Sequence, residues 1–442
     1  MARPPWSFQN EPERVLLVGV RLKDQRREAV EDLLDELAQL AATAGAEIVG
    51  RLVCSQRSFH PATLIGKGKA GQIAAQAAAE SITTVLFDDD LSPAQGRNLA
   101  EITGCKIVDR AQLILDIFAQ HAQSRAGRLQ IELAQLQYLL PRLRGMWTHL
   151  ERQQGGIGLR GPGEKQLELD RRRIVDRIGR IRASLKEVRQ RRAEMRRGRR
   201  RHGWALLTLV GYTNAGKSTL INHLADARVE ADDRLFATLD PTTRQIRLPN
   251  HQPALITDTV GFIRKLPHHL VESFKATLEE VIEADLLIHV IDAAHPGVED
   301  QIRAVEQVLR ELGAATKPRI SVLNKMDLTE AGPQAVRLAP GLERPVTLSA
   351  LTGEGLDLFR AELADFLKSR TLRVRLRVPP TEGKLLAAIR SSGRVFEEKY
   401  EADGAVRLDA SLPGRLLGLC AAYRMDEGEA SPLEDENGVR DL

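Results

Sequence analysis

The chain has 442 residues, of which 43% are apolar and 28% are charged, and this composition excludes global disorder. Its length provides material for roughly three domains of about 150 residues each. The formal net charge of +4 conceals a local asymmetry, because residues 171–201 hold fifteen Arg or Lys and three acidic residues. The rest of the chain is therefore acidic, and a single basic stripe of this kind favours a polyanionic partner.

Cellular setting can be predicted from what the sequence lacks. The three cysteines, Cys54, Cys105 and Cys420, are scattered without the spacing of a metal site or a disulfide framework. No segment approaches the roughly 18 consecutive apolar residues of a membrane-spanning helix. The first residues also lack the apolar core of a secretion signal. We therefore expect a soluble, cytoplasmic protein with no membrane span, and we expect it to be a monomer.

Residues 1–122 are expected to form an N-terminal α/β domain. Strands are predicted over Val15–Val20, Glu47–Ser55, Thr84–Phe87 and Ile107–Val108. Between them, helices are predicted over Gln25–Ala44 and Gly71–Glu80, with a third helix opening at Ser92-Pro93. Strands that alternate with helices predict a parallel sheet. The segment Ile65–Lys69 (IGKGK) is compatible both with a plain turn and with a contact to RNA phosphate.

Residues 123–202 are predicted to form an antiparallel helical hairpin. Leu129, Leu133, Leu136, Leu140 and Leu143 repeat at 3.5-residue spacing, and so do Ile174, Ile178, Ile181, Leu185 and Val188. The glycine-rich segment Gln153–Gly163 separates the two seams and is expected to be a flexible tip. The basic stripe lies on the second helix, which favours nucleic-acid binding over a role as a plain spacer.

The chemistry is expected in residues 203–368. A buried strand, Leu206–Val210, leads into GYTNAGKS (Gly211–Ser218) and a helix over Thr219–Ala225. This is the GxxxxGK[ST] phosphate-binding loop in its required strand–loop–helix setting. Its backbone N–H groups and the helix N-terminus attract phosphate. We expect Lys217 to reach the β- and γ-phosphates and the Ser218 hydroxyl to bind Mg²⁺.

A second motif follows the predicted strand Ala254–Thr257. The segment Asp258–Gly261 (DTVG) is expected to place a carboxylate close to the Mg²⁺ site and the Gly261 N–H at a γ-phosphate oxygen. A further buried strand is predicted over Leu286–Ile291.

Two more motifs select the base. The strand Arg319–Leu323 ends in Asn324–Asp327 (NKMD), whose aspartate can accept hydrogen bonds from the N1–H and amine of guanine. Adenine lacks both donors there, so the buried carboxylate discriminates strongly. After the strand Val346–Leu348, the backbone of Ser349-Ala350 can meet the guanine carbonyl. Four motifs in this order, each at the carboxyl end of a strand, predict a GTPase.

Two parts of the sequence are less informative. A threonine in Leu235–Arg244 (LFATLDPTTR) is expected to bind Mg²⁺ and sense the γ-phosphate, and spacing leaves Thr238, Thr242 and Thr243 as alternatives. Residues 369–442 are expected to form a small α+β domain with an acidic tail. Strands are predicted there over Leu372–Val378, Arg394–Tyr400 and Ala405–Leu408, with a helix over Gly383–Ile389.

The motifs resemble those of the HflX family, in the Obg–HflX branch of translation-linked GTPases. The matching segments are GYTNAGKST, FATLDPTTR, DTVGF, NKMD and SAL, together with LIGKGK and GPGEKQLELDRR outside the nucleotide region. The resemblance implies a GTPase that uses Mg²⁺, takes GTP as substrate, and binds the large ribosomal subunit and its rRNA. It also implies that the protein can split or rescue stalled ribosomes, and that Thr238 is the Mg²⁺ ligand and γ-phosphate sensor.

The candidate site residues follow from these motifs. Lys217, Thr238 and Gly261 are the expected catalytic residues, and Ser218 and Thr238 the expected metal ligands. The expected nucleotide-binding residues are Gly211, Tyr212, Thr213, Asn214, Ala215, Gly216, Lys217, Ser218 and Thr219; Phe236, Ala237, Thr238, Leu239 and Asp240; Asp258, Thr259, Val260 and Gly261; Asn324, Lys325, Met326 and Asp327; and Ser349, Ala350 and Leu351.

Phe262 follows DTVG at a position where many GTPases carry a water-orienting glutamine. A phenyl ring cannot polarise water, so slow intrinsic hydrolysis is expected. Two other functions remain open at this point. One is a GTPase acting in ribosome assembly or tRNA modification, and the other is a weakly hydrolysing, nucleotide-sensing RNA-binding scaffold.

Overall fold

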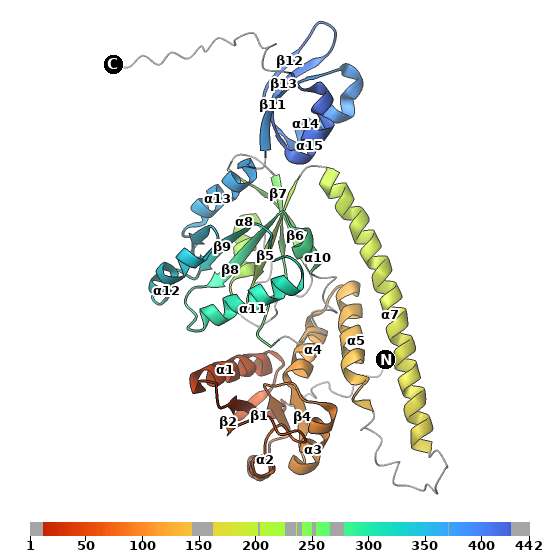
Figure 1. The fold of residues 1–442 in the computed structure, drawn as a ribbon, viewed down its shortest axis with the longest axis vertical. Coiled ribbons are helices and arrows are strands. Elements are labelled where there is room, and N and C mark those ends of the chain that lie inside the picture. Colours follow the sequence, from red (N-terminus) through yellow and green to blue (C-terminus); the bar gives the residue numbers. More distant parts are fainter. Residues whose placement is uncertain are drawn as a thin grey trace.

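The computed structural model is of a multidomain α/β protein, and it describes residues 12–143, 162–201, 204–225, 236, 241–249, 253–265, 278–369 and 371–425. Three sheets lie one above another along the long axis, and one long helix runs beside the lower two (Figure 1). Among the described residues, no helix is both long and apolar enough to cross a bilayer.

The N-terminal domain contains a parallel four-stranded sheet in the order β2-β1-β3-β4. Its elements are β1 (Arg14–Leu22), α1 (Arg27–Thr43), β2 (Glu47–Gln56), α2 (Lys67–Glu80), β3 (Thr84–Phe87), α3 (Pro93–Thr103), β4 (Lys106–Asp109) and α4 (Arg110–His121). The predicted start of α3 is confirmed, since Ser92 and Gln95 form a reciprocal capping box.

One prediction in this domain was wrong at its boundary. Helix α2 begins at Lys67, four residues before the predicted start, so Lys67–Lys69 form its first turn and not a plain loop. The two glycines, Gly68 and Gly71, lower helix propensity and obscured the start. Burial of Ala70 and Ile73 against the sheet outweighs that cost.

Two helices form the predicted hairpin, α5 (Arg125–Leu139) and α7 (Pro162–Arg201), and they lie side by side (Figure 1). Their seams meet in a cluster that includes Leu133, Ile178 and Ile181. Outside the seam, both guanidinium Nε and Nη2 of Arg177 bond the carboxylate of Glu132, at 2.7 and 2.8 Å.

The hairpin also corrects two details. Leu143 lies beyond the end of α5 and is absent from the seam cluster. Pro162 and Gly163, expected in the tip, belong to α7, because proline is well suited to the first position of a helix. The remainder of the tip, residues 153–161, lies outside the described residues.

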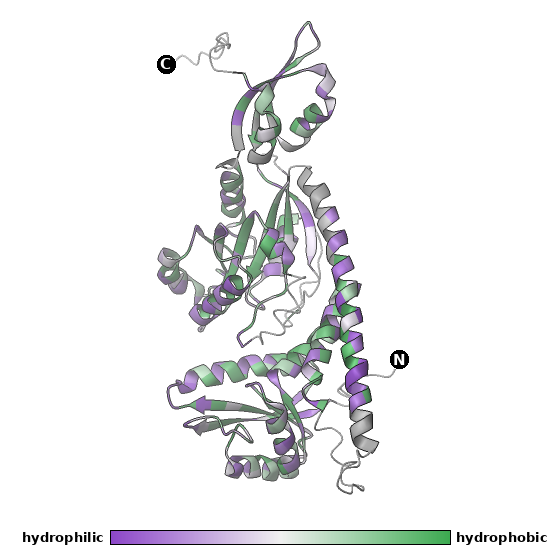
Figure 2. Ribbon diagram, turned by 45° about the vertical axis from the view of Figure 1, so that its right-hand side comes forward, coloured by the Kyte–Doolittle hydropathy of each residue, from purple (hydrophilic) through white to green (hydrophobic). Residues whose placement is uncertain are grey.

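The central domain has a six-stranded sheet in the order β10-β9-β8-β5-β7-β6, parallel except for β6. Its strands are β5 (Ala205–Gly211), β6 (Thr242–Arg247), β7 (Pro253–Asp258), β8 (Leu286–Asp292), β9 (Arg319–Asn324) and β10 (Pro345–Thr347). Its helices are α8 (Lys217–Ala225), α10 (Glu279–Glu283), α11 (Val298–Glu311), α12 (Ala331–Leu338) and α13 (Leu356–Ser369). In Figure 2 the strands at the centre of this sheet are mostly hydrophobic, whereas α7 is mostly hydrophilic.

The C-terminal domain is an antiparallel sheet in the order β11-β13-β12. Its elements are β11 (Thr371–Val378), α14 (Gly383–Ser392), β12 (Arg394–Tyr400), β13 (Val406–Pro413) and α15 (Gly414–Leu419). This domain also has short 3-10 turns at Pro380–Glu382 and Ala421–Tyr423, and a third such turn, Ala339–Gly341, follows α12 in the central domain. The predicted strands and helix are present, and α15 is an additional element.

Candidate nucleotide-binding site

The predicted motifs meet at one edge of the central sheet. Strands β5, β7, β8 and β9 are parallel, so their carboxyl ends share that edge. The loops that follow β5, β7 and β9 carry Gly211–Ser218, Asp258–Gly261 and Asn324–Asp327. Ser349–Leu351 follows β10 beside them. Loops at the carboxyl ends of parallel strands are where α/β proteins bind ligands.

Two glycines of the phosphate-binding loop are required by close contacts. A Cβ atom on Gly211 would lie 2.3 Å from the carbonyl oxygen of Val290 on β8. Gly216 has φ +93°, and a Cβ there would lie 2.2 Å from Nδ2 of Asn324. Larger residues at either position would push the loop away from the sheet.

Lys217 is buried at the start of α8 and reaches back across the loop. Its Nζ donates hydrogen bonds to the carbonyl oxygens of Gly211 and Tyr212, at 3.1 and 2.6 Å. Burial lowers the pKa of Lys217 to about 8, and the negative charge of Asp258 opposes this shift. A phosphate group would supply the negative charge that this desolvated ammonium needs.

Ser218 and Asp258 place two oxygen donors together. The hydroxyl of Ser218 donates to Oδ2 of Asp258 at 2.8 Å. Next to them, the buried Thr259 hydroxyl is held by the carbonyl oxygen of Leu209 at 2.6 Å. A hydroxyl and a carboxylate are hard oxygen ligands, so this pair fits a Mg²⁺ ion bound with phosphates.

The DTVG segment packs directly onto the phosphate-binding loop. Phe262 N–H donates to the carbonyl oxygen of Gly211 at 3.0 Å, and Thr213 N–H donates to that of Phe262 at 2.8 Å. A Cβ on Gly261 would lie 2.8 Å from Cα of Thr213 and 3.1 Å from Nζ of Lys217. Gly261 and Lys217 are therefore close enough to bind one phosphate group together.

The two motifs expected to select the base are hydrogen-bonded to one another and to the phosphate-binding loop. Asn324 Nδ2 donates to the carbonyl oxygen of Ala215, and Ala350 N–H donates to Asn324 Oδ1, both at 2.8 Å. Ser349 Oγ donates to Asp327 Oδ1 at 2.6 Å. Lys325, with φ +64°, pairs with Asp292 at 2.7 Å. Met326 N–H donates to the carbonyl oxygen of Leu348 at 3.3 Å, and the side chain of Leu351 is exposed.

The threonine alternatives are resolved only in part. Ala237, Thr238, Leu239 and Asp240 lie outside the described residues. Thr242 and Thr243 belong to β6, a strand that we did not predict, and the Thr243 hydroxyl lies 3.0 Å from that of Thr257. With one buried apolar side chain, Ile246, this edge strand has little hydrophobic pattern to reveal it.

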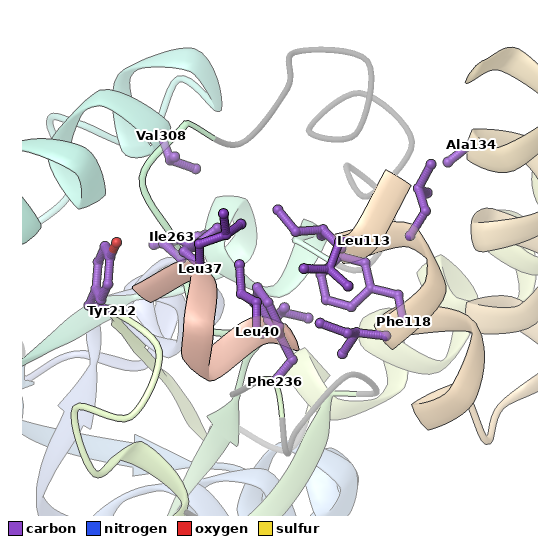
Figure 3. Packing of buried hydrophobic residues seen from close by; sticks show 14 of the residues in the cluster. Leu37, Leu40, Leu113, Phe118, Ala134, Tyr212, Phe236, Ile263 and Val308 are labelled. Atoms are coloured by element: carbon purple, nitrogen blue, oxygen red, sulfur yellow. The ribbon is translucent and has the colours of Figure 1, made fainter. Parts of the chain in front are cut away.

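Two of the expected nucleotide-binding residues direct their side chains to the N-terminal domain. Phe236 packs edge-to-face on Phe118 of α4, with ring centroids 4.6 Å apart. The Tyr212 hydroxyl donates to Glu36 of α1 at 2.5 Å. Figure 3 shows both residues in a hydrophobic cluster built from the two domains, and the side chain of Phe262 is buried in the same cluster.

The contact between the two domains also contains charged residues that the sequence patterns did not reveal. Arg264 and Lys265, just after the DTVGF motif, bind carboxylates of the N-terminal domain. One signal was available: Glu36 lies three residues after Leu33 and four before Leu40, on the predicted apolar face of α1. A charge on such a face indicates a buried ion pair.

The fold and the phosphate-binding loop define a P-loop GTPase. Three family models match the chain: "GTP-binding GTPase N-terminal" over residues 31–119, "GTP-binding GTPase Middle Region" over 121–199, and "50S ribosome-binding GTPase" over 207–325. The chain belongs to the HflX family of GTPases.

Individual relatives match over most of the chain. The GTPase HflX of Lacrimispora saccharolytica is 44% identical over 92% of this chain and 96% of its own length. The GTPase HflX of Escherichia coli is 46% identical over 86% of this chain and 89% of its own length. Among solved structures, a GTP-binding protein from the archaeon Sulfolobus solfataricus in complex with GDP is 25% identical, covers 80% of this chain and 98% of that chain, and has a TM-score of 0.41.

Proposed function

We propose that this GTPase is a ribosome-associated factor. In this proposal it binds the large ribosomal subunit through rRNA while GTP is bound, hydrolyses GTP to GDP and phosphate, and is then released. Splitting or rescue of stalled ribosomes is the cellular task that we assign to this cycle, in the cytoplasm and as a monomer. The match of residues 207–325 to a family described as a 50S ribosome-binding GTPase supports the proposal.

The observation that carries the proposal is the connection between the basic helix and the nucleotide site. Helix α7 ends at Arg201, and β5, which leads into the phosphate-binding loop, begins at Ala205. The fifteen basic residues of 171–201 are therefore on a helix joined almost directly to that strand. Basic side chains bind phosphate backbones without reading the base sequence, which suits rRNA.

We assign the expected domain division to this cycle. Residues 1–122 and 123–202 contact rRNA, residues 203–368 bind and hydrolyse GTP, and residues 369–442 form a C-terminal appendage. The gaps between α4 and α5 and between α7 and β5 support the first two boundaries. The last boundary falls beside Ser369, where α13 ends.

We assign the nucleotide contacts to the four loops at the sheet edge. Lys217 and the Gly261 N–H hold the γ-phosphate, and the backbone of Gly211–Thr219 surrounds the phosphate chain. Asp327 reads guanine N1–H and its amine, while Asn324 and Ala350 fix the loops that carry this contact. The contacts between Asn324, Ala215 and Ala350 support this arrangement, because they connect the base-selecting loops to the phosphate-binding loop.

Mg²⁺ is the metal that these oxygen donors fit, with Ser218 and Thr238 as ligands and Asp258 beside them. When bound, it would neutralise charge on the β- and γ-phosphates. The side chain of Phe262 is buried, so it neither polarises nor holds the attacking water. Another group, supplied by this chain or by the ribosome, orients that water.

Co-sedimentation with purified large ribosomal subunits tests the proposal. We expect strong binding with a non-hydrolysable GTP analogue and weak binding with GDP, because the γ-phosphate orders the loops that contact it. Equal binding with both nucleotides would contradict the gated cycle and favour a scaffold. Release of 50S from 70S particles with the analogue would separately support splitting.

A charge-reversal variant tests the contribution of the basic helix. Arg189, Arg192, Arg196 and Arg200 are changed together to Glu, and binding is measured across a range of salt concentrations. The slope of log affinity against log salt should flatten by about 3, at roughly 0.7–0.9 per lost phosphate contact. A control reverses two exposed arginines outside α7, Arg303 on α11 and Arg337 on α12, and should leave the slope unchanged. An unchanged slope would leave α7 as a spacer.

A further inference from the structure

A partly buried ionic contact joins the segment after DTVGF to the N-terminal domain. Arg264 Nη2 lies 2.7 Å from Asp32 and 3.2 Å from Glu36, two carboxylates of α1. Lys265 Nζ lies 2.6 Å from Asp88 and 2.7 Å from Asp89, which follow β3. We call these six side chains the interdomain ion-pair cluster.

The cluster continues into the core of the N-terminal domain. Arg110, at the start of α4, is fully buried and pairs with both Glu36 and Asp88. Each of these two carboxylates therefore faces a cation from its own domain and another from the central domain. Since buried carboxylates need such partners, Arg110 holds them ready to receive Arg264 and Lys265.

Tyr212 connects the cluster to the phosphate-binding loop. Its hydroxyl donates to Glu36 Oε2 at 2.5 Å and accepts a hydrogen bond from the Arg264 backbone N–H at 2.8 Å. Its carbonyl oxygen accepts from Lys217 Nζ at 2.6 Å. A single residue therefore bonds the carboxylate of α1, the segment after DTVGF and the lysine that faces the phosphates.

These contacts all hold the DTVGF segment against the phosphate-binding loop. Phe262 is fixed by backbone hydrogen bonds to Gly211 and Thr213, and the next residues are anchored in the N-terminal domain. Lys265 adopts φ +54°, a left-handed conformation that is costly for a side-chain-bearing residue. Its two carboxylate partners offset that cost.

We propose that Glu36 and Lys265 are positioning residues for recognition of the γ-phosphate: through Tyr212 and Arg264, and through Asp88 and Asp89, the N-terminal domain holds Gly261 beside Lys217. The inference rests on the proposed roles of Lys217 and Gly261. Because linkage is reciprocal, a γ-phosphate bound by these two residues strengthens the interdomain contact in return. GDP lacks that phosphate, so its affinity depends less on the cluster.

The test compares the affinities of the full chain, with Mg²⁺, for GDP and for a non-hydrolysable GTP analogue. The variants are Glu36→Gln and Lys265→Gln. We expect each to weaken analogue binding by about 10-fold, a typical size for coupling between sites, and to leave GDP binding within about 2-fold. A variant that merely destabilises the fold would lower both affinities alike, so the ratio of the two separates positioning from structural damage.

Two matched controls accompany these variants. Asp35→Asn removes the neighbouring carboxylate of α1, which pairs with Arg51 inside the N-terminal domain, and should leave the ratio unchanged. Lys265→Arg keeps the charge and should restore most of the analogue affinity. If the buried Glu36→Gln variant fails to fold, the half-buried Lys265 still provides the test.

Different outcomes overturn the inference and the proposed γ-phosphate site. In the double variant Glu36→Gln, Tyr212→Phe, the loss should be no larger than the greater single loss, since both changes break one connection. A ratio that stays at the wild-type value in Glu36→Gln and Lys265→Gln overturns the inference. A Lys217→Ala variant that binds the analogue like wild type would instead overturn the proposed γ-phosphate site.

Discussion

The N-terminal and central domains place different groups at equivalent edges of similar sheets, where the carboxyl ends of the parallel strands lie. In both domains, the parallel strands end at one edge, and the loops that follow them leave from there. At that edge the central sheet carries the glycine-rich loop with its backbone N–H groups and Lys217, together with Asp258 and Asp292 at the ends of β7 and β8. The N-terminal sheet carries Asp88, Asp89 and Asp109 at its own edge.

This difference shows how the same sheet edge can bind either a phosphate chain or basic side chains of the same protein. The edge of the central sheet suits a polyphosphate, which is an external anion. The edge of the N-terminal sheet receives cations from the same chain, Arg264 and Lys265. Because both residues closely follow the DTVGF motif, a single short segment separates the two edges.

The largest expected effect concerns Asp327, the carboxylate that we propose reads the base. Asp327→Asn should move preference from guanine to xanthine nucleotides, because an amide matches the altered base edge. Selectivity for a base whose donors pair with a site group reaches about 10⁴-fold or more. Competition binding with GTP and xanthosine triphosphate measures it, and unchanged GTP binding would remove Asp327 from the site.

Lys217→Ala should remove the cation from the central edge. We expect turnover to fall by about 10²–10³-fold, which is the typical effect of removing one preorganised hydrogen-bond donor that stabilises charge in the transition state. The fold should persist, which circular dichroism can check. Single-turnover hydrolysis provides the measurement, and a wild-type rate would show that the central edge does not depend on this lysine.

Phe262→Ala should have a smaller effect on chemistry. Its side chain packs in the hydrophobic cluster between the two domains. We therefore expect basal hydrolysis to stay within about one order of magnitude, whereas loss of a true general base costs about 10²–10⁴-fold. A collapse of that size with nucleotide binding intact would place Phe262 in the reaction itself.

The smallest effect on the nucleotide site is expected from a carboxylate of the N-terminal domain, which acts on stability. Burial raises the pKa of Asp116 to about 7, Lys106 opposes this shift, and Glu13 and Asp109 add to it. The folded state is thus favoured below about pH 4, and this contribution is lost as pH rises through about 7. A rise of about three in this pKa corresponds to about 4 kcal/mol, so Asp116→Asn should stabilise the protein by up to that amount at pH 8 and by little at pH 4. Chemical denaturation at both pH values tests this, and equal effects would contradict it.

The position of the phosphate-binding loop between a strand and a helix could be predicted because its motif is local. Gly211, Gly216 and Lys217 lie in one continuous motif, and its flanking strand is a plain apolar run. The hairpin could be predicted because its seams repeat at 3.5 residues, and α5 and α7 meet along those seams.

The rest depends on contacts distant in sequence. Glu36 and Arg264 are separated by 228 residues, and no local pattern relates them. Strand β6 depends on pairing with β7 more than on its own composition. The left-handed backbone of Lys265 likewise depends on carboxylates from another domain.

The central claim is that the two edges act as one unit, and hydrogen exchange on the full chain tests it most directly. Exchange is compared with GDP and with a non-hydrolysable GTP analogue, both with Mg²⁺, in peptides covering α1 and residues 86–92. We expect slower exchange in both peptides with the analogue, because γ-phosphate binding tightens the ion pairs of Arg264 and Lys265. Equal exchange with the two nucleotides, at full occupancy of each, would contradict the claim.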